Sequence, residues 1–460
     1  MPSPRSQLLA VLLFAALLRG GVLWVMRDNL NEDRDAYREI GENLATYRIY
    51  GLGKDGEQPR PTAYRPPLYP VLLAKLAGEG LAVTPLRVAI LHWLLGMGTV
   101  GLTWLVGKKM AVQGTRDRGQ ETTWPSAIAA LIVACDPILL HWSTYVMTET
   151  LAAFLAVLAL YTLARFHVDR RPMNAAFAGC ALGLAVLCRP TFLPWAGLCG
   201  LGLLFLQANG GRQPPDTSAA AKQSLIHEYA RRLANLAAFG IVAAVVVFPW
   251  GYRNYQQFDK PIITTTHGGY TLYLANNGDF YEYLETDSSG VPWSSQNLDD
   301  ALTKLRGQPR AYFINPTVYR TLETSVDNIC YRLARAEISA QPLMFAYSCL
   351  YRACQLWSPL PSKLTADETG KRALLRYATC AWYLAVCAAA LVGVWKLRGK
   401  LLRSPWVWGV LLCLVFTLVH TFYWSNLRMR APLMPFVAIV AAVGAQFVVT
   451  RFSGLKARRQ

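Results

Sequence analysis

The stretch LANLAAFGIVAAVVVFPW, residues 233–250, contains no charged side chain. A helix needs about 20 predominantly apolar residues to cross the hydrocarbon core of a bilayer. Within a helix the backbone N–H and C=O groups bond to each other, which is necessary because lipid chains offer them no hydrogen-bond partners. The stretch therefore predicts a membrane-spanning helix.

Similar apolar runs recur throughout the 460 residues, of which 53% are hydrophobic and only 16% are charged. They predict an all-α polytopic membrane protein with roughly ten transmembrane helices. The candidate spans lie near residues 7–26, 86–106, 125–144, 147–165, 174–188, 191–207, 233–250, 374–395, 405–424 and 431–450.

The first apolar run follows Arg5 and has some features of a secretory signal. No small-residue cleavage site follows it, and the apolar character resumes through Val22 to Met26. We therefore expect it to remain as the first span.

The basic residues predict the orientation of the chain, because Lys and Arg concentrate in short cytoplasmic loops. If the amino terminus is cytoplasmic, every second loop is basic, and so is the carboxyl end. The basic clusters are Lys108, Lys109, Arg116 and Arg118; Arg165, Arg170 and Arg171; Arg212, Arg231 and Arg232; Lys396, Arg398, Lys400 and Arg403; and Lys456, Arg458 and Arg459. We expect a plasma (inner) membrane protein with both termini in the cytoplasm.

The same orientation divides the chain into three regions. Residues 1–250 form a transmembrane module that includes a first extracytoplasmic loop at 27–85, residues 251–373 form a second extracytoplasmic region, and residues 374–460 contain the last helices and a basic tail. Apolar residues at helical spacing predict an amphipathic helix from Thr317 to Ile338, on the membrane or over a cleft. The composition of 207–222 indicates a flexible linker.

The formal charge of +18 does not indicate nucleic-acid binding, because the basic residues are scattered in short clusters between apolar runs. Anionic lipid head groups are the better partner. The ten cysteines contain no CxxC pair. Cys330, Cys349 and Cys354 lie in a polar region, where a disulfide among them stays open.

Acidic residues at the start of the first outer loop are one candidate for chemistry. Asp33 and Asp35 directly precede a run with Ile40, Leu44 and Tyr47 at helical spacing. They could simply cap that helix and favour its dipole. Alternatively, such a carboxylate deprotonates an acceptor hydroxyl or holds a divalent metal ion over a phosphate.

A second candidate is Glu149, at the outer end of a long apolar stretch. An ionisable group at that depth is costly and points to a functional site, although capping beside Thr148 is an alternative. Asp136 and Arg19 are also embedded, and either could be an interhelical hydrogen-bonding group.

Several arginines lie at the predicted outer helix ends, although Lys and Arg are usually concentrated on the cytoplasmic side of a membrane. Together they predict an anion such as a phosphate, which a guanidinium binds through a bidentate fork. Snorkelling, or pairing with the acids, is the alternative for each of them. They are Arg65, Arg189, Arg253, Arg428 and Arg430.

Histidines and aromatic residues lie at the same level of the predicted membrane. His141, His267 and His420 could complete a metal site with the acids, but no fixed ligand spacing is present. Aromatic residues such as Tyr270 fit an interface belt, and some could stack on a sugar ring.

The succession of motifs resembles the membrane-embedded glycosyltransferases of the GT-C fold, in particular bacterial relatives of protein O-mannosyltransferases and of the lipid A aminoarabinose transferase. The matching pieces extend from about residue 7 to residue 450. They are Asp33-x-x-x-Tyr37-x-x-Ile40, Tyr64-Arg65-Pro66-Pro67-Leu68-Tyr69-Pro70, Met147-Thr148-Glu149, Leu187-Cys188-Arg189-Pro190-Thr191, Pro249-Trp250-x-x-Arg253-Asn254, Gly268-Gly269-Tyr270 before Asn276-Asn277, and Arg428-Met429-Arg430-Ala431-Pro432.

The resemblance implies an inverting transferase that uses a polyprenyl-phosphate sugar donor and has outer loops covering its cleft. It places Asp33 at the catalytic position, Glu149 at a second acid and Arg189 at the donor phosphate. Two departures stand out. Arg65 occurs where the aminoarabinose transferase has a metal-coordinating Glu, and Asp33-Arg34 replaces the Asp-Glu pair of O-mannosyltransferases. The metal therefore stays unknown, and the acceptor is a lipid, a glycan or a protein.

Two other classes compete with this interpretation. A transporter or lipid flippase would also use embedded charges such as Glu149, Asp136 and Arg19, but would line a path with them at several depths. The charges here gather toward the outer face, and no internal repeat supports an inverted-repeat transporter. A structural or receptor-like membrane protein would tolerate replacement of the outer acids.

Overall fold

The computed structural model describes residues 3–53, 58–77, 82–112, 124–205, 219–286, 291–300, 316–363 and 368–457. The described residues are mainly helical, as predicted. The helices of the apolar bundle are α1 (Pro4–Val25), α4 (Pro85–Val112), α5 (Trp124–Cys135), α6 (Pro137–Trp142), α7 (Glu149–Val168), α8 (Pro172–Cys188), α9 (Phe192–Phe205), α10 (Ala219–Phe258), α16 (Gly370–Leu401), α17 (Trp406–Phe422) and α18 (Met434–Ala457).

Within the described residues, 6 helices are long and apolar enough to cross a membrane. They correspond to α1, α4, α7, α10, α16, and α18 with the turn before it. Four further predicted spans coincide with shorter apolar helices at Pro125–Cys135, Pro172–Cys188, Phe192–Phe205 and Trp406–Phe422. The chain is a multi-pass membrane protein, and the count of roughly ten crossings stays a prediction.

The predicted span at 125–144 is not one continuous helix, because two helices occupy it. The helix α5 ends at Cys135, and Asp136 is extended and caps α6 by accepting a hydrogen bond from the Leu139 amide, 2.9 Å away. Pro137 has no amide hydrogen and disfavours helical geometry in the residue before it, so the chain breaks there.

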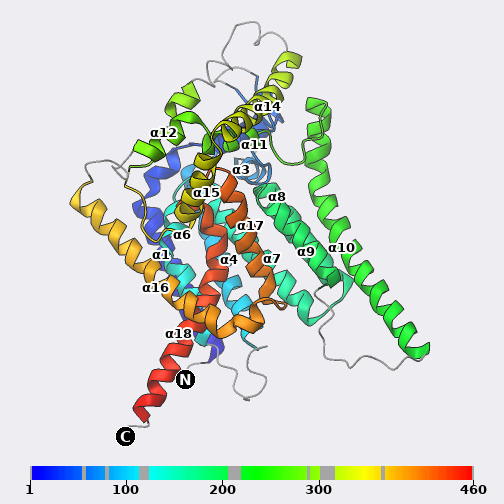
Figure 1. Ribbon diagram of the computed structural model, residues 1–460, viewed down its shortest axis with the longest axis vertical. Coiled ribbons are helices and arrows are strands. Elements are labelled where there is room, and N and C mark those ends of the chain that lie inside the picture. The colour runs from blue at the N-terminus through cyan, green and yellow to red at the C-terminus, as the bar shows by residue number, and fades with distance from the viewer. Residues whose placement is uncertain are drawn as a thin grey trace.

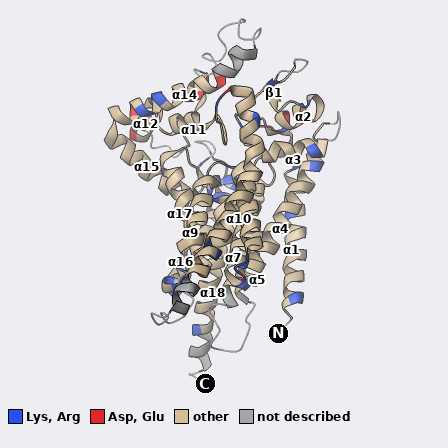
Figure 2. Cartoon of the chain, turned by 90° about the vertical axis from the view of Figure 1, so that its right-hand side faces the viewer, with Lys and Arg blue, Asp and Glu red and all other residues tan. Residues whose placement is uncertain are grey.

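The helices form one bundle, with both chain termini at the same end (Figure 1). The opposite end, which we call the loop end, carries α11 (Gly268–Ala275), α12 (Gly278–Thr286) and α14 (Pro316–Ala340). Figure 2 shows acidic residues of α12 and α14 at this end. Residues 207–218 of the predicted linker 207–222 lie outside the described residues. Residues 219–222 belong to α10, which begins at Ala219.

Glycines allow two helices of the bundle to pack backbone to backbone. A Cβ atom at Gly393 of α16 would lie 2.0 Å from the Val440 carbonyl oxygen of α18. A Cβ atom at Gly444 of α18 would lie equally close to the carbonyl oxygen of Ala389. Both separations are far below van der Waals contact, so only glycine permits this crossing.

The first loop region is ordered into short elements at the loop end. They are η1 (Arg27–Asn31), α2 (Tyr37–Tyr47), the strands β1 (Gly51–Leu52) and β2 (Arg60–Pro61), and α3 (Leu68–Ala77). The predicted helix after Asp33 is confirmed as α2. The strands pair antiparallel, with Gly51 opposite Pro61 and Leu52 opposite Arg60.

The predicted amphipathic helix is confirmed as α14, which packs over this loop. Glu323 of α14 accepts hydrogen bonds from the Thr62 hydroxyl and the Ala63 amide, each at 2.9 Å, and from the Thr266 hydroxyl. Burial raises the pKa of Glu323, while these donors act in the opposite direction. One carboxylate thus joins the first loop, the segment after α10, and α14.

α14 is followed by α15 (Pro342–Trp357). Cys330, Cys349 and Cys354, for which a disulfide was left open, are all free thiols in the structure. Cys330 is buried, whereas Cys354 is exposed.

Candidate functional site

Glu149 is the first residue of α7 and forms the centre of a buried ion-pair cluster. Its side chain is 1% exposed, and Oε1 lies 2.8 Å from Nη2 of Arg189 and 3.6 Å from Nε of Arg428. Arg189 is the residue that ends α8, and Arg428 lies in the turn η3 (Leu427–Leu433) before α18. Two guanidinium groups against one carboxylate leave this cluster with a net positive charge.

Further contacts fix both guanidinium groups. Arg189 donates from Nε to the Thr148 hydroxyl, 2.9 Å away, and Nη1 lies 3.8 Å from the Met429 sulfur. Arg428 lies over the Trp142 ring, 5.1 Å from its centroid. Preorganised cations of this kind are suited to stabilising negative charge as it develops on a bound group.

A second ion pair joins Asp35 and Arg65 in the first loop. Arg65 donates from Nη2 to Oδ1 of Asp35 at 2.8 Å, and from Nε to the Asp35 carbonyl at 2.9 Å. Its Nη1 donates to Nε2 of His267, 3.3 Å away. His267 in turn stacks on Tyr270, with 5.0 Å between ring centroids. Burial lowers the pKa of Arg65, but Tyr37 and Asp35 outweigh it, so the net shift is upward.

Tyr37 contacts Arg65 and lies within electrostatic range of Arg189 and Glu149. It is buried at the start of α2, and Arg65 lies over its ring at 5.5 Å. Burial raises the pKa of Tyr37 to about 12, and the charges of Arg65, Asp35, Arg189 and Glu149 all act on its hydroxyl. Tyr37 therefore stays protonated at neutral pH and can donate a hydrogen bond.

Asp33 is oriented by the helix that follows it. The N-cap residue of α2 is Ala36, not Asp33, but Oδ2 of Asp33 accepts a hydrogen bond from the Glu39 amide in the first turn of α2 at 2.9 Å. Its Oδ1 is shielded from solvent and has no hydrogen-bond partner in the described part of the chain. One carboxylate oxygen is thus held by the backbone while the other remains available.

Tyr69 of α3 is a buried phenol whose pKa is affected by both Asp33 and Glu149. Burial raises the pKa of the Tyr69 phenol, and the charges of Asp33, Tyr37 and Glu149 add to this effect. Its ring packs edge-on against Tyr37 at 5.4 Å, and its hydroxyl lies 2.8 Å from Nε2 of His92. Tyr69 therefore contacts Tyr37 and lies within electrostatic range of Asp33 and Glu149.

The remaining two predicted arginines face backbone carbonyls. Arg253 donates to the carbonyl oxygens of Thr62 and Tyr50 at 2.8 and 2.7 Å, which clamps the first loop to α10. Arg430 donates to the Ser358 carbonyl at 2.6 Å and lies 4.0 Å over the Tyr383 ring. Arg253 therefore positions the first loop against α10, and Arg430 positions the segment after α15 against η3.

The deeply embedded Asp136 and Arg19 also have structural contacts. Asp136 Oδ1 accepts from the Tyr383 hydroxyl at 3.0 Å in addition to capping α6, and Arg19 donates to the Val133 carbonyl at 2.9 Å. His420 donates from Nδ1 to the Trp424 carbonyl. No group of three or more His, Cys, Asp or Glu side chains suited to a metal ion occurs among the residues that were placed.

Several neighbours of the site were not predicted from the sequence as site residues. Tyr69 lies inside the quoted Tyr64–Pro70 motif but carried no separate signal, and His92 lies in an apolar helix. Nδ1 of His92 donates to the Ser143 carbonyl at 2.7 Å, so Nε2 of the ring accepts a hydrogen bond from the Tyr69 hydroxyl. Glu323 lies in the predicted amphipathic helix, whose pattern indicated a surface but not this contact.

Comparisons with known proteins give a family match to one part of the chain and a shared fold over nearly all of it. Residues 118–213 match the family described as dolichyl-phosphate-mannose-protein mannosyltransferase. No curated protein sequence matches the chain.

Solved structures match over nearly the whole chain. The archaeal oligosaccharyltransferase AglB of Archaeoglobus fulgidus, in complex with an inhibitory peptide and a dolichol-phosphate, has a TM-score of 0.50 at 15% identity and covers 98% of this chain. The same organism's oligosaccharyltransferase, tethered with an acceptor peptide, also has a TM-score of 0.50, at 14% identity over 96% of this chain.

ArnT of Cupriavidus metallidurans bound to undecaprenyl phosphate has a TM-score of 0.40 at 16% identity, over 96% of this chain and 78% of its own. The match covers 51% of the AglB chain and 50% of the peptide-tethered chain, so this chain spans about half the length of those oligosaccharyltransferases. The shared arrangement of the helices shows that the chain has the GT-C fold of membrane-embedded glycosyltransferases.

Proposed function

We propose that the protein is a membrane glycosyltransferase that moves a sugar from a polyprenyl-phosphate-linked donor to an acceptor at the loop end, with inversion at the anomeric carbon. The loop end faces the exterior of the plasma membrane, and both termini lie in the cytoplasm. The partial family match and the GT-C fold support this class of reaction. AglB was solved with a dolichol-phosphate, which is a polyprenyl-type lipid phosphate.

The donor phosphate binds at the cluster of Glu149, Arg189 and Arg428. The cluster carries a net positive charge, so an anion compensates it better than water does. Both guanidinium groups present several donors to phosphate oxygens. As the bond between the anomeric carbon and the phosphate oxygen breaks, these cations stabilise the charge on the leaving phosphate.

Asp33 accepts the proton of the acceptor in this mechanism. The acceptor oxygen attacks the anomeric carbon from the face opposite the phosphate, while its proton moves to the partner-free Oδ1 of Asp33. The oriented carboxylate with one unengaged oxygen is the observation that carries the proposal. Asp35 is engaged with Arg65, so it positions that arginine rather than acting as the base.

The sugar lies between the two ion-pair clusters, beside Tyr37. The neutral hydroxyl of Tyr37, the guanidinium of Arg65 and the ring of His267 offer hydrogen-bond partners for sugar hydroxyls. Tyr270 adds an aromatic face for stacking. The donor sugar is a hexose or a pentose, and the acceptor is a lipid, a glycan or a protein.

Substitution of Asp33 by Asn tests the proposal. With a polyprenyl-phosphate sugar in reconstituted vesicles, Asp33→Asn should lower transfer by at least about 10²-fold, because the amide cannot accept the proton. The exposed Asp279→Asn in α12 is the control and should retain activity. Full transfer by Asp33→Asn would rule out Asp33 as the base. Solute movement into the vesicles without covalent transfer would instead favour a transporter.

A further inference from the structure

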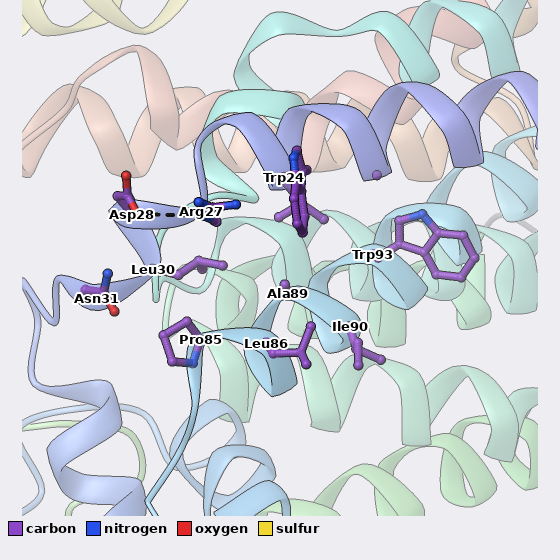
Figure 3. Close-up of a pocket in the computed structure, with 12 residues that line it drawn as sticks. Trp24, Arg27, Asp28, Leu30, Asn31, Pro85, Leu86, Ala89, Ile90 and Trp93 are labelled. Atoms are coloured by element: carbon purple, nitrogen blue, oxygen red, sulfur yellow. Dashed lines mark ion pairs between the residues drawn. The ribbon is translucent and has the colours of Figure 1, made fainter.

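A cavity of about 530 Å³ lies between α1, η1 and the start of α4, outside the ion-pair clusters. Its sides are formed by Trp24 and Trp93, and Leu86 and Ile90 of α4 contribute to its floor (Figure 3). Trp24, Leu86 and Ile90 are 71%, 70% and 52% exposed, so the cavity opens sideways from the bundle. In a membrane this opening faces the hydrocarbon chains of lipids. We call it the α1–α4 groove.

The polar groups of the groove lie at its loop end, where η1 forms the rim. Arg27 contacts the Trp24 ring, 4.8 Å from its centroid, which holds the guanidinium beside the apolar opening. Asp28 lies 4.0 Å from Arg27 and is 91% exposed, so this pair is loose and open to water. An apolar trough with a cation only at its outer end matches an amphiphile whose phosphate lies at the membrane surface.

The rim continues directly into the proposed catalytic base. Asn31 is the last residue of η1 and lies two residues before Asp33, a separation of at most about 7 Å between Cα atoms. Arg38 of α2 donates to the carbonyls of both Leu30 and Asn31, and Asn29 donates to the Thr144 hydroxyl at 3.1 Å. The rim therefore holds a fixed position relative to the loop that carries Asp33.

From this placement we infer that the α1–α4 groove binds the acyl chain of the acceptor, and that the acceptor is an anionic lipid with a hydroxyl-bearing head group. Its chain lies along Trp24 and Trp93, its phosphate meets Arg27, and its head group extends past Asn31 to Asp33. This inference rests on the proposed transferase function and narrows the acceptor to a lipid. The donor phosphate remains at Arg189 and Arg428, which do not line the groove.

Two adjacent glycines of α1 provide a matched test. Gly20 lines the groove, and a Cβ atom there would lie 3.8 Å from Nε1 of Trp93, an ordinary contact distance. Gly21 has nothing within 4 Å of its Cβ position and is not among the lining residues. Gly20→Phe should fill the groove, whereas Gly21→Phe adds the same ring beside it.

The binding assay uses phosphatidylcholine nanodiscs that contain phosphatidylglycerol with a diazirine on its acyl chain. Photo-crosslinks, mapped by mass spectrometry, should fall on residues 20–24 and 86–93. Gly20→Phe should reduce them about tenfold or more, because several buried methylene groups lose their site. Gly21→Phe should leave them unchanged, and Arg27→Gln should reduce them severalfold. Crosslinks that lie elsewhere, or that Gly20→Phe leaves intact, overturn the inference.

Crosslinking is measured in the Asp33→Asn protein without donor, so its result does not depend on catalysis. Transfer to phosphatidylglycerol is then measured with Asp33 intact, and Gly20→Phe should lower it about tenfold relative to Gly21→Phe. Transfer that Gly20→Phe leaves unchanged overturns the acceptor role. If the wild type transfers sugar to no acceptor while crosslinking is specific, the proposed function fails and the lipid site stands.

Discussion

Replacing Glu149 by Gln should have opposite effects on folding and on phosphate binding. The carboxylate is 1% exposed and lies 2.8 Å from Arg189 and 3.6 Å from Arg428, whose side chains are only 11% and 21% exposed. Gln keeps the shape of the side chain but removes the charge, so two buried guanidinium groups lose their counter-ion. Removing one partner from a buried pair typically costs about 3–5 kcal/mol.

The free energy of unfolding can be measured by steric trapping in bicelles. The control is Glu228→Gln, which breaks the i,i+4 pair of Glu228 with Arg232, in which the glutamate side chain is 38% exposed. That control should cost only about 0.3–0.5 kcal/mol. A loss below about 1 kcal/mol for Glu149→Gln would show that water screens the cluster and that Glu149 is not its principal counter-ion.

Phosphate binding provides the second half of this prediction. Without the competing carboxylate, Arg189 and Arg428 should bind undecaprenyl phosphate about tenfold more tightly, and saturating ligand should recover part of the lost stability. Titration calorimetry or native mass spectrometry measures the affinity. If Glu149→Gln binds the lipid phosphate more weakly than wild type, this cluster is not the donor-phosphate site.

Two further substitutions separate structural contacts from the proposed chemistry. Glu323→Ala removes the hydrogen-bond acceptor for Thr62, Ala63 and Thr266. The amide hydrogens of residues 60–66 should then exchange with solvent at least about tenfold faster. Unchanged exchange would show that α14 does not hold the first loop. Tyr383→Phe removes one of the two buried donors to Oδ1 of Asp136 and leaves only the Leu139 amide, so it should lower the free energy of unfolding by about 1–3 kcal/mol with transfer intact; a loss of transfer at unchanged stability would place this network in the mechanism.

The amino-acid sequence by itself determined that the chain crosses a membrane repeatedly, because uncharged runs such as 233–250 have no other stable environment for their length. It also determined that α2 begins just after Asp33 and that α14 is amphipathic, since both patterns are local. It indicated three candidates by their positions: Asp33 at the start of the first outer loop, Glu149 in a long apolar stretch, and Arg189 at an outer helix end. The break at Asp136 was missed, although Pro137 carried a local signal for it.

The tertiary structure alone decided which charges are partners. Arg65, Arg189, Arg253, Arg428 and Arg430 carry the same charge at similar depths, yet Arg189 and Arg428 meet Glu149, Arg65 meets Asp35, and the other two meet carbonyl oxygens. Partner choice depends on how helices distant in sequence pack and rotate against each other. In this protein that packing depends on small residues such as Gly393 and Gly444, which let the backbones approach closely.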